Sequence, residues 1–427
     1  MAENRRNFVK NMTVMGLLAP ASSFEWMNYT HQTGPTFDEL ESIKAANEDE
    51  FWKAIQQCFA QSEEFINLEN GYFSPTPLPV LNAFVENNRM VNANSSFYMR
   101  RRKDDDRERV RKELAEFAGV NADEVALMRS TTDGLNVLIH GLPLKAGDEV
   151  VLSNQDYDSM VEAFKQRAQR EGIVLKTIDL PLQPANDEEV VNVYEKAITP
   201  KTRLLLVTHM IHLTGHLLPV KKVCEMAHAK GVEVMVDGAH AFAHIDFRIP
   251  DLDCDYYAAS LHKWLCNPLG AGILWVKKEH IEKVWPLFGE TSRPKTDIRK
   301  FERFGTQNTA IQLSLSAAIK FHTIIGSNRK MARLRWLKNY WVEQLSKVDG
   351  VSFNTPIQNE RTGAIANFAL MGYTPTQLAA ALYDSYKIFT VGIETPAVNG
   401  VRVTPHLYTT QQHLDALISA VKELAKK

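Results

Sequence analysis

The chain has 427 residues, 44% of them hydrophobic, and a formal net charge of −2. That length allows a large buried core and two domains. The near-neutral charge argues against nucleic acid as the main partner, because such binding depends on an excess of basic residues. No apolar run in the sequence is long enough to span a bilayer.

The first 30 residues have the features of an export signal. Arg5 and Arg6 precede a short apolar stretch, MTVMGLLAPA, which ends in the A-x-A pattern Ala19-Pro20-Ala21. A twin-arginine type of signal predicts a periplasmic enzyme exported in folded form. The alternative is a basic arm on a cytoplasmic enzyme. The sequence then becomes polar and acidic, and we expect a linker and N-terminal segment over 31–60.

Apolar segments and helical patterns alternate through the middle of the chain. Strands are predicted at 149–154, 173–180, 203–210, 233–240, 254–260 and 271–277. Helices are predicted at 106–118, where the pattern is amphipathic, and at 135–141, 156–171, 187–198 and 219–230. This alternation is typical of a parallel α/β sheet with helices on both faces. The side-chain pocket for a ligand is expected from loops at 92–104 and 288–304.

The pattern changes after about residue 309. Helices are predicted at 309–325, 328–348, 374–386 and 409–426, and short strands in VSFN, AIANFAL, FTVGI and VRVTP. This part is interpreted as a smaller α+β domain.

Polar residues fall where several strands are predicted to end, the edge of a parallel sheet at which ligands bind. The run Ser130-Thr131-Thr132-Asp133-Gly134 follows the strand-like EVALMR and precedes a helix. Hydroxyl and backbone N–H groups at a helix start can bind phosphate. Alone the run is a weak signal, because serine and threonine at a helix start are usually only caps.

An acid, a lysine and an arginine complete the candidate site. Asp237 ends the most apolar strand, and Lys263 follows the next one, in SLHKW. A buried aspartate needs a cation to stay ionised, and a lysine in an apolar pocket is a Schiff-base nucleophile. Pyridoxal phosphate (PLP) requires such a pair, because the aspartate holds its ring nitrogen and the lysine holds its aldehyde. Arg402 can bind a carboxylate through two hydrogen bonds. The structural alternatives are a turn cap, a loop lysine and a surface ion pair.

No metal site or serine nucleophile is indicated. The sequence contains no HExxH, no Cys/His cluster and no GxSxG. Its four cysteines form no CxxC pair and are interpreted as reduced structural thiols.

Together these motifs resemble the class V aminotransferases, a family of fold-type I PLP-dependent enzymes, from about residue 60 onward. The motifs are N-x-x-N-G-Y-F at 67–73, STTDGLN at 130–136, GDEVVLSNQDYDS at 147–159, VDGAHA at 236–241, SLHKW at 260–264, GTQN at 305–308 and RVTPHLYTT at 402–410. The N-G-Y-F segment and the tyrosine of NQDYDS are most similar to the isopenicillin N epimerase-like branch. The resemblance implies a large PLP-binding domain at 61–308, with a mostly parallel seven-stranded sheet, and a small domain at 309–427.

The resemblance also implies which residues bind the cofactor. Lys263 would form the Schiff base, and Asp237 would pair with the pyridine N–H. Tyr157 would stack on the ring, and His240 would lie beside the ring hydroxyl. The residues expected to hold the phosphate are Thr131, Thr132, Ser260 and His262, with Thr306 reaching across the interface of a homodimer.

On the substrate side, Arg402 would bind an α-carboxylate, and Asn70 and Gly71 would line the path of the substrate. Two features depart from the family. His212 stands where a small or amide residue is expected, and is either a second acid or base or a neutral hydrogen-bond donor to the ring hydroxyl. The loop GIETPAVNG lacks the cysteine that desulfurases carry there, and Cys254 and Cys266 lie in other elements, which argues against desulfuration.

The resemblance implies a reaction at the α-carbon of an amino acid or an amino-acid-derived substrate, with Lys263 removing the Cα proton. Return of a proton to the opposite face, from Tyr157 or His212, gives epimerisation. Return to the cofactor gives transamination, and loss of a β-substituent gives elimination. The alternative from another class is a PLP-binding protein without turnover.

Overall fold

The computed structural model describes residues 34–45, 47–356 and 359–426. The expected export signal in residues 1–30 lies outside them. The first elements are the helices α2 (Phe37–Ser42), α3 (Glu48–Gln57), α4 (Leu78–Arg101) and α5 (Lys103–Ala118), with the short strand β1 (Ile66–Asn67) between α3 and α4.

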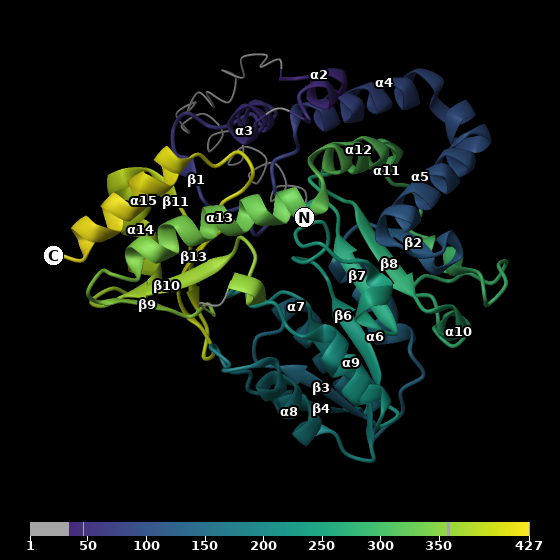
Figure 1. Cartoon of the computed structure of the whole chain (residues 1–427). Coiled ribbons are helices and arrows are strands. Elements are labelled where there is room, and N and C mark those ends of the chain that lie inside the picture. The colour runs from purple at the N-terminus through teal and green to yellow at the C-terminus, as the bar shows by residue number, and fades with distance from the viewer. Residues whose placement is uncertain (1–33, 46, 357–358, 427) are drawn as a thin grey trace, which may run out of the picture. The chain divides into compact units, whose positions relative to one another are not determined.

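A seven-stranded sheet forms the centre of the chain (Figure 1). Its strands are β2 (Val125–Met128), β3 (Glu149–Ser153), β4 (Val174–Ile178), β5 (Thr202–Thr208), β6 (Glu233–Asp237), β7 (Tyr256–Ser260) and β8 (Gly272–Val276). Their order is β2-β8-β7-β6-β5-β3-β4, and only β8 runs antiparallel to its neighbours. The predicted mostly parallel sheet is confirmed.

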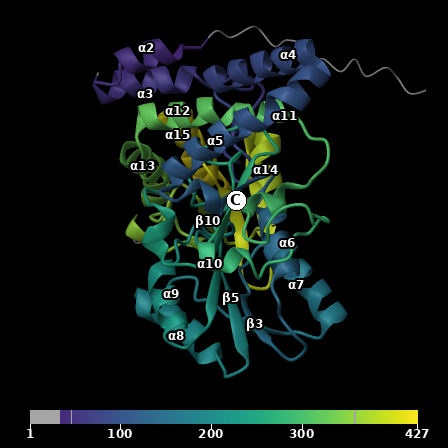
Figure 2. The ribbon, with the colours of Figure 1, turned by 90° about the vertical axis from the view of Figure 1, so that its right-hand side faces the viewer.

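The helices that connect these strands cover both faces of the sheet (Figure 2). They are α6 (Thr131–Gly141), α7 (Asp158–Glu171), α8 (Asp187–Ala197) and α9 (Val220–His228), and the short α10 (Lys278–Ile281) follows the last strand, β8. Alternate strand residues face opposite ways, so Val150 packs in the core with α6 and α7, and Val151 in the core with α8 and α9. Because both of their faces are buried, the inner strands are mostly apolar rather than alternating, whereas the edge strand β4 is partly exposed.

The C-terminal part contains α11 (Thr309–Leu313), α12 (Leu315–Ile325), α13 (Ser327–Leu345), α14 (Pro375–Tyr386) and α15 (Gln411–Leu424). A four-stranded antiparallel sheet is formed by β9 (Val351–Phe353), β10 (Ala366–Leu370), β12 (Val391–Glu394) and β13 (Asn399–Val403), in the order β12-β13-β10-β9. The remaining strand, β11 (Ile388–Phe389), pairs with β1. The predicted small α+β region is present, and α14 packs against β12 and β13.

The division into domains at residue 308 stays a prediction. Helices α11 and α12 follow that residue but pack against α4 and α5, as Figures 1 and 2 show. One apolar core includes residues from both sides of the boundary, such as Val236 and Val401.

Three segments differ from their predicted form. The segment 31–60, expected as a linker, contains α2 and α3, because Leu40, Phe51 and Ile55 supply apolar faces that are fully buried. The loop expected at 92–104 is helical on either side of a kink at Ser95, where φ is 46°. The loop expected at 288–304 ends in a short helical turn whose Glu302 is paired with Arg111, and Glu302 lines a hollow together with Met99 and Lys103 of the other expected loop.

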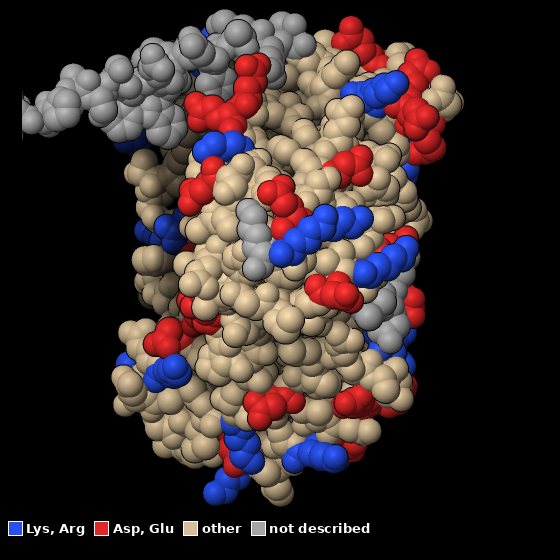
Figure 3. Space-filling view, turned by 90° about the vertical axis from the view of Figure 1, so that its left-hand side faces the viewer, with Lys and Arg blue, Asp and Glu red and all other residues tan. Residues whose placement is uncertain are grey.

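Charge is evenly mixed over the face shown in Figure 3, where Lys and Arg side chains alternate with Asp and Glu. Among the helices of the described ranges, none combines the length and apolar character needed to cross a membrane.

Candidate active site

The amine of Lys263 lies at the end of β7 against the imidazole of His240. Its Nζ is 2.9 Å from His240 Nε2, and the indole N–H of Trp264 donates to His240 Nδ1 at 3.3 Å. Since Nδ1 accepts, a neutral imidazole carries its proton on Nε2 and donates to the lysine nitrogen. Burial lowers the pKa of Lys263 to about 8, and the charge of Arg402 acts in the same direction. The site therefore stabilises a neutral, nucleophilic amine.

Asp237 lies at the end of β6, on the strand beside Lys263. The side chain is buried, and its Oδ1 accepts the backbone N–H of Ala239 at 2.9 Å. Gly238 lets the chain turn here, because a Cβ at that position would lie 2.0 Å from the Tyr257 hydroxyl. Burial raises the pKa of Asp237. A carboxylate in this position needs a buried cation to remain ionised.

A cradle of hydroxyl and backbone N–H groups is formed where α6 meets β7. Ser130 caps the helix, and Thr131 lies in its first turn, earlier than the predicted start at residue 135. Ser260 Oγ accepts the backbone N–H of Thr131 at 2.9 Å and lies 2.8 Å from the Thr131 hydroxyl. His262, on the turn after β7, donates from Nδ1 to the Ala271 carbonyl at 3.2 Å. The helix N-terminus and these hydroxyl groups are a favourable site for an anion.

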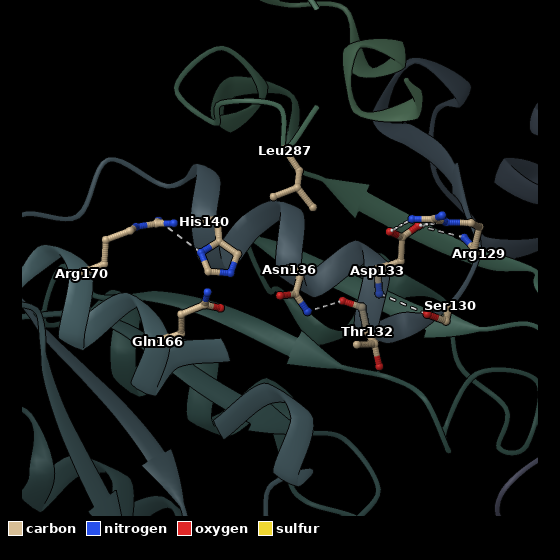
Figure 4. A pocket seen from close by; sticks show the side chains of 9 residues that line it. All are labelled: Arg129, Ser130, Thr132, Asp133, Asn136, His140, Gln166, Arg170 and Leu287. Atoms are coloured by element: carbon tan, nitrogen blue, oxygen red, sulfur yellow. Dashed lines mark hydrogen bonds and ion pairs between the residues drawn. The ribbon is translucent and has the colours of Figure 1, made fainter. Parts of the chain in front are cut away.

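Figure 4 shows an open hollow beside this cradle, along the outer side of α6. Its volume is about 520 Å³, and its lining includes Ser130, Thr132, Asn136 and Arg170. Lys263 is not part of that lining. The hollow therefore adjoins the helix N-terminus but does not contain the reactive amine.

The ring of His212 lies close to the rings of both Tyr157 and His240. Tyr157, which caps α7 and is 37% exposed, meets His212 edge-on with ring centroids 5.3 Å apart. The His212 ring is nearly parallel to that of His240 at 6.4 Å. Burial lowers the pKa of His212 to about 3, and Arg402 and Lys263 act in the same direction. Its Nδ1 is buried and has no hydrogen-bond partner among the described residues, as expected where a bound group supplies the partner.

Arg402 lies on β13 of the four-stranded sheet, and its side chain contacts the segment that carries His212. Its Nη1 donates to the His212 carbonyl at 2.9 Å, and Glu69 accepts from its Nη2 at 2.6 Å. The backbone of Gly71 lies against the guanidinium group, since a Cβ there would come within 2.7 Å of Cζ.

The role predicted for Asn70 is not supported. The side chain is fully buried, donates to the Thr404 carbonyl at 2.8 Å and accepts the Tyr408 hydroxyl at 2.7 Å. Asn70 therefore anchors its segment and does not present its amide to a ligand. Thr306 is exposed, and no described contact joins it to the other candidate residues.

Sequence reasoning missed Glu69, Trp264 and Asp156. The carboxylate of Asp156 is buried, accepts the Ser153 backbone N–H and the Thr208 hydroxyl, both at 2.7 Å, and thereby fixes the turn before Tyr157. Burial raises its pKa to about 7. The only signal for it was its place inside the motif NQDYDS.

The residues present fit PLP. A lysine with a lowered pKa can bind the aldehyde, a buried aspartate lacks the cation that a pyridinium supplies, and the N-terminus of α6 can take the phosphate. His212, whose ring lies beside that of His240, also has a buried Nδ1 without a hydrogen-bond partner among the described residues. No group of three or more His, Cys, Asp or Glu side chains in the described part of the chain is arranged to hold a metal ion.

Solved structures resemble this fold at low sequence identity. The cysteine desulfurase of Thermococcus onnurineus NA1 superposes with a TM-score of 0.76 at 23% identity, covering 88% of this chain and 98% of that one. A C-DES mutant with glycine covalently linked to its PLP cofactor gives a TM-score of 0.77 at 19% identity, covering 84% and 97%.

Curated proteins match more closely in sequence. Isopenicillin N epimerase from Amycolatopsis lactamdurans is 31% identical over 398 residues, which is 88% of this chain and 99% of the epimerase. A probable cysteine desulfurase from Xylella fastidiosa is 29% identical, covering 64% of this chain and 68% of the relative. The family model "Aminotransferase class-V" matches residues 66–417. The chain therefore belongs to the class V aminotransferase family of PLP-dependent enzymes.

Proposed function

We propose that this enzyme acts on the α-carbon of an amino acid or an amino-acid-derived substrate, and that its reaction is epimerisation or amino-group transfer. The observation that carries the proposal is the amine of Lys263, whose pKa burial lowers to about 8 and which lies against His240 beside the buried carboxylate of Asp237. The likeness to isopenicillin N epimerase over 99% of that protein favours inversion as the reaction.

Each residue of the site has a role in this proposal. PLP, when bound, acts as an electron sink for negative charge that develops at Cα. Asp237 would keep the ring nitrogen protonated, and Lys263 Nζ would take the Cα proton. Thr131, Thr132, Ser260 and His262 would hold the phosphate.

Inversion also needs a proton donor on the face of Cα opposite Lys263. Tyr157 and His212 lie together beside the site. With its pKa lowered to about 3 by burial, His212 is neutral at physiological pH and has no extra proton to give. We therefore assign the donation to the Tyr157 hydroxyl and a hydrogen bond to the cofactor to His212.

Elimination at the β-carbon is a second candidate, favoured by the desulfurase relatives. A desulfurase-like transfer of sulfur to a cysteine is not favoured, because all four cysteines are buried and none lies in the loop 392–400. A PLP-binding protein without turnover would not need a lysine whose pKa is lowered in this way.

One experiment separates these outcomes. The PLP-loaded enzyme is incubated in D₂O with single L- and D-amino acids, and the products are followed by NMR and chiral chromatography. Deuterium at Cα with formation of the other enantiomer supports inversion. A keto acid with the aminated cofactor indicates transfer, and ammonia with an α-keto acid that has lost its β-substituent indicates elimination. No exchange with any substrate would contradict enzymatic action at Cα.

A homodimer and export belong to the same proposal. Thr306 is exposed and apart from the other phosphate residues, which is the expected position for a residue that serves a partner's site. Light scattering of the holoenzyme tests the dimer. Cell fractionation with N-terminal sequencing of the mature protein, beside an Arg5→Lys, Arg6→Lys variant, tests export to the periplasm against a cytoplasmic location.

A further inference from the structure

The guanidinium group of Arg402 is already paired with a carboxylate of this chain. Glu69 Oε1 accepts from Nη2 at 2.6 Å, and Glu69 Oε2 accepts from Nε at 3.2 Å. The two side chains are 9% and 8% exposed. This is the two-pronged geometry with which an arginine binds a ligand carboxylate, and here a protein side chain occupies one edge of the arginine.

Glu69 is fixed in this position by its own turn. Its Oε1 also accepts the backbone N–H groups of Gly71 and Tyr72, both at 3.0 Å, and its own N–H donates to Asn67 at 3.0 Å. The residue also forms a β-bridge to Thr404. Removing the carboxylate from Arg402 would break several buried hydrogen bonds, which is costly. A substrate therefore meets the ion pair intact.

The intact pair leaves little of the arginine for a substrate. The guanidinium has five N–H groups, and contacts to Glu69 and the His212 carbonyl use three of them. One N–H on each terminal nitrogen has no partner among the described residues. A carboxylate bound there would gain two hydrogen bonds but would lie beside a buried negative charge, which opposes it strongly at low dielectric. The charge of Glu69 also reaches the amine of Lys263 and opposes that of Arg402 there.

We propose, building on the proposed function, that Glu69 determines substrate specificity by weakening the attraction of Arg402 for an α-carboxylate, so that the site also accepts primary amines with no carboxylate. The substrate class then includes amino compounds whose α-carboxylate is absent or masked as an amide or ester. An arginine without a carboxylate partner in the protein would instead select free α-amino acids.

The first test compares ligands that differ only in the carboxylate. L-Phenylalanine and 2-phenylethylamine, and L-alanine and ethylamine, are titrated into the holoenzyme, and the change in the visible cofactor spectrum gives each Kd. In the wild type we expect the amino acid and its amine to bind within about tenfold of each other. In Glu69→Gln, which keeps an oxygen acceptor for the turn, the amino acid should bind at least about tenfold tighter while the amine changes less than about threefold.

Two further variants serve as controls. Glu69→Asp keeps the charge and should retain the wild-type ratio. Glu394→Gln removes a carboxylate on β12, which pairs with the strand of Arg402. This carboxylate accepts the backbone N–H of Thr376 on α14, and its removal should also leave the ratio unchanged. The proposal is overturned if Glu69→Gln weakens the amino acid as much as the amine, or if the wild type already prefers the amino acid by more than about a hundredfold.

The second test does not depend on the proposed chemistry. 3-Phenylpropionate has a carboxylate but no amine, and its binding is measured by calorimetry. We expect a Kd of about 1 mM or weaker for the wild type and at least tenfold tighter binding to Glu69→Gln, with the gain lost in the double variant Glu69→Gln, Arg402→Gln. Wild-type binding tighter than about 10 μM would refute the proposal, even if no variant can be purified. Failure of the proposed function would instead appear as the lack of Cα exchange or of a spectral response, with the 3-phenylpropionate result unchanged.

Discussion

Nζ of Lys263 and Nε2 of His240 lie 2.9 Å apart, and the direction of the hydrogen bond between them is set by a third residue. The indole N–H of Trp264 occupies Nδ1 of the imidazole, so the proton of the neutral ring is on Nε2. His240 is neutral, because burial lowers its pKa well below the usual value. The lysine amine can accept this hydrogen bond only in its neutral form, which a pKa of about 8 makes accessible near neutral pH.

The first prediction concerns the pH dependence of cofactor capture. With a pKa of about 8, the neutral fraction of Lys263 rises through pH 8 and approaches completion above it. The rate at which the apoenzyme takes up PLP should therefore rise with a midpoint near pH 8 and reach a plateau, while a lysine with its ordinary pKa would give a rate still rising above about pH 10. Stopped-flow absorbance measures the rate.

Lys300 provides the control for that measurement. Its pKa is also lowered to about 8 by burial, but its amine donates to the carbonyls of Ile281 and Lys295. Borohydride reduction followed by peptide mapping should place the cofactor on Lys263 alone. Lys263→Met should abolish labelling, and Lys300→Met should not. A label on another lysine would contradict the assignment.

The second prediction concerns the tautomer of His240. Trp264 is buried between the rings of His244, at 3.6 Å, and His406, at 5.5 Å. In Trp264→Phe an aromatic ring is kept but the N–H is lost, so His240 can place its proton on Nδ1 and accept from a protonated Lys263. The midpoint of PLP capture should move up by about one pH unit.

A second tryptophan separates this effect from loss of packing. Trp275, on β8, is also buried, and its indole N–H donates to Glu124 at 3.4 Å. Trp275→Phe should leave the midpoint unchanged. Equal shifts in the two variants would mean that general loosening, and not the tautomer, controls the amine.

The third prediction is that Asp237 lowers the stability of the apoenzyme, although the PLP-loaded enzyme needs it for activity. Burial raises the pKa of this carboxyl in the folded apoenzyme. Between the ordinary value of about 3.9 and the raised value, the folded state keeps a proton that the unfolded state has lost. The free energy of unfolding of the apoenzyme therefore falls as the pH rises through this window. An asparagine side chain does not titrate, so in Asp237→Asn this loss is absent.

Calorimetry of the apo and PLP-loaded forms checks this. At pH 8 the apo form of Asp237→Asn should melt about 2–4 °C above the wild type, and the difference should shrink as the pH is lowered towards the ordinary pKa of an aspartate. In the loaded form the variant should lose activity on the order of 10²-fold. An apo variant less stable than the wild type at pH 8 would show that the carboxylate already has a cation partner in the protein.

The large sheet was predictable because both of its faces are buried. Most of its strands are short apolar runs, as in EVVLS and EVMVD, and this pattern does not depend on distant partners. The helices α2, α3 and α4 were not predicted, because only a few residues of each, such as Phe51 and Leu78, mark the buried side.

The site residues on strand ends were predictable for the same reason, since parallel strands bring their ends to one edge. The sequence did not show which distant side chains the site residues contact. Glu69 and Arg402 are 333 positions apart in the sequence, and nothing in NLENGYF indicates that its acid meets that arginine. The same limit explains Asn70, whose amide is used by Thr404 and Tyr408, from a distant segment.

The last prediction separates Tyr157 from His212. If inversion is the reaction, Tyr157→Phe removes the hydroxyl that donates the proton, and the rate of enantiomer formation should fall on the order of 10²-fold or more. Exchange of the Cα proton with solvent should persist, because Lys263 still removes and returns it on its own face. His212→Asn should weaken PLP binding but keep the ratio of inversion to exchange, because a ring with a pKa of about 3 is not a proton donor at neutral pH. Both rates come from NMR and chiral chromatography of one reaction in D₂O.

Tyr383→Phe is the control, because Tyr383 is similarly exposed, at 39%, and contacts Phe65 and Phe389. Loss of inversion in His212→Asn with inversion kept in Tyr157→Phe would reverse the assignment of the donor.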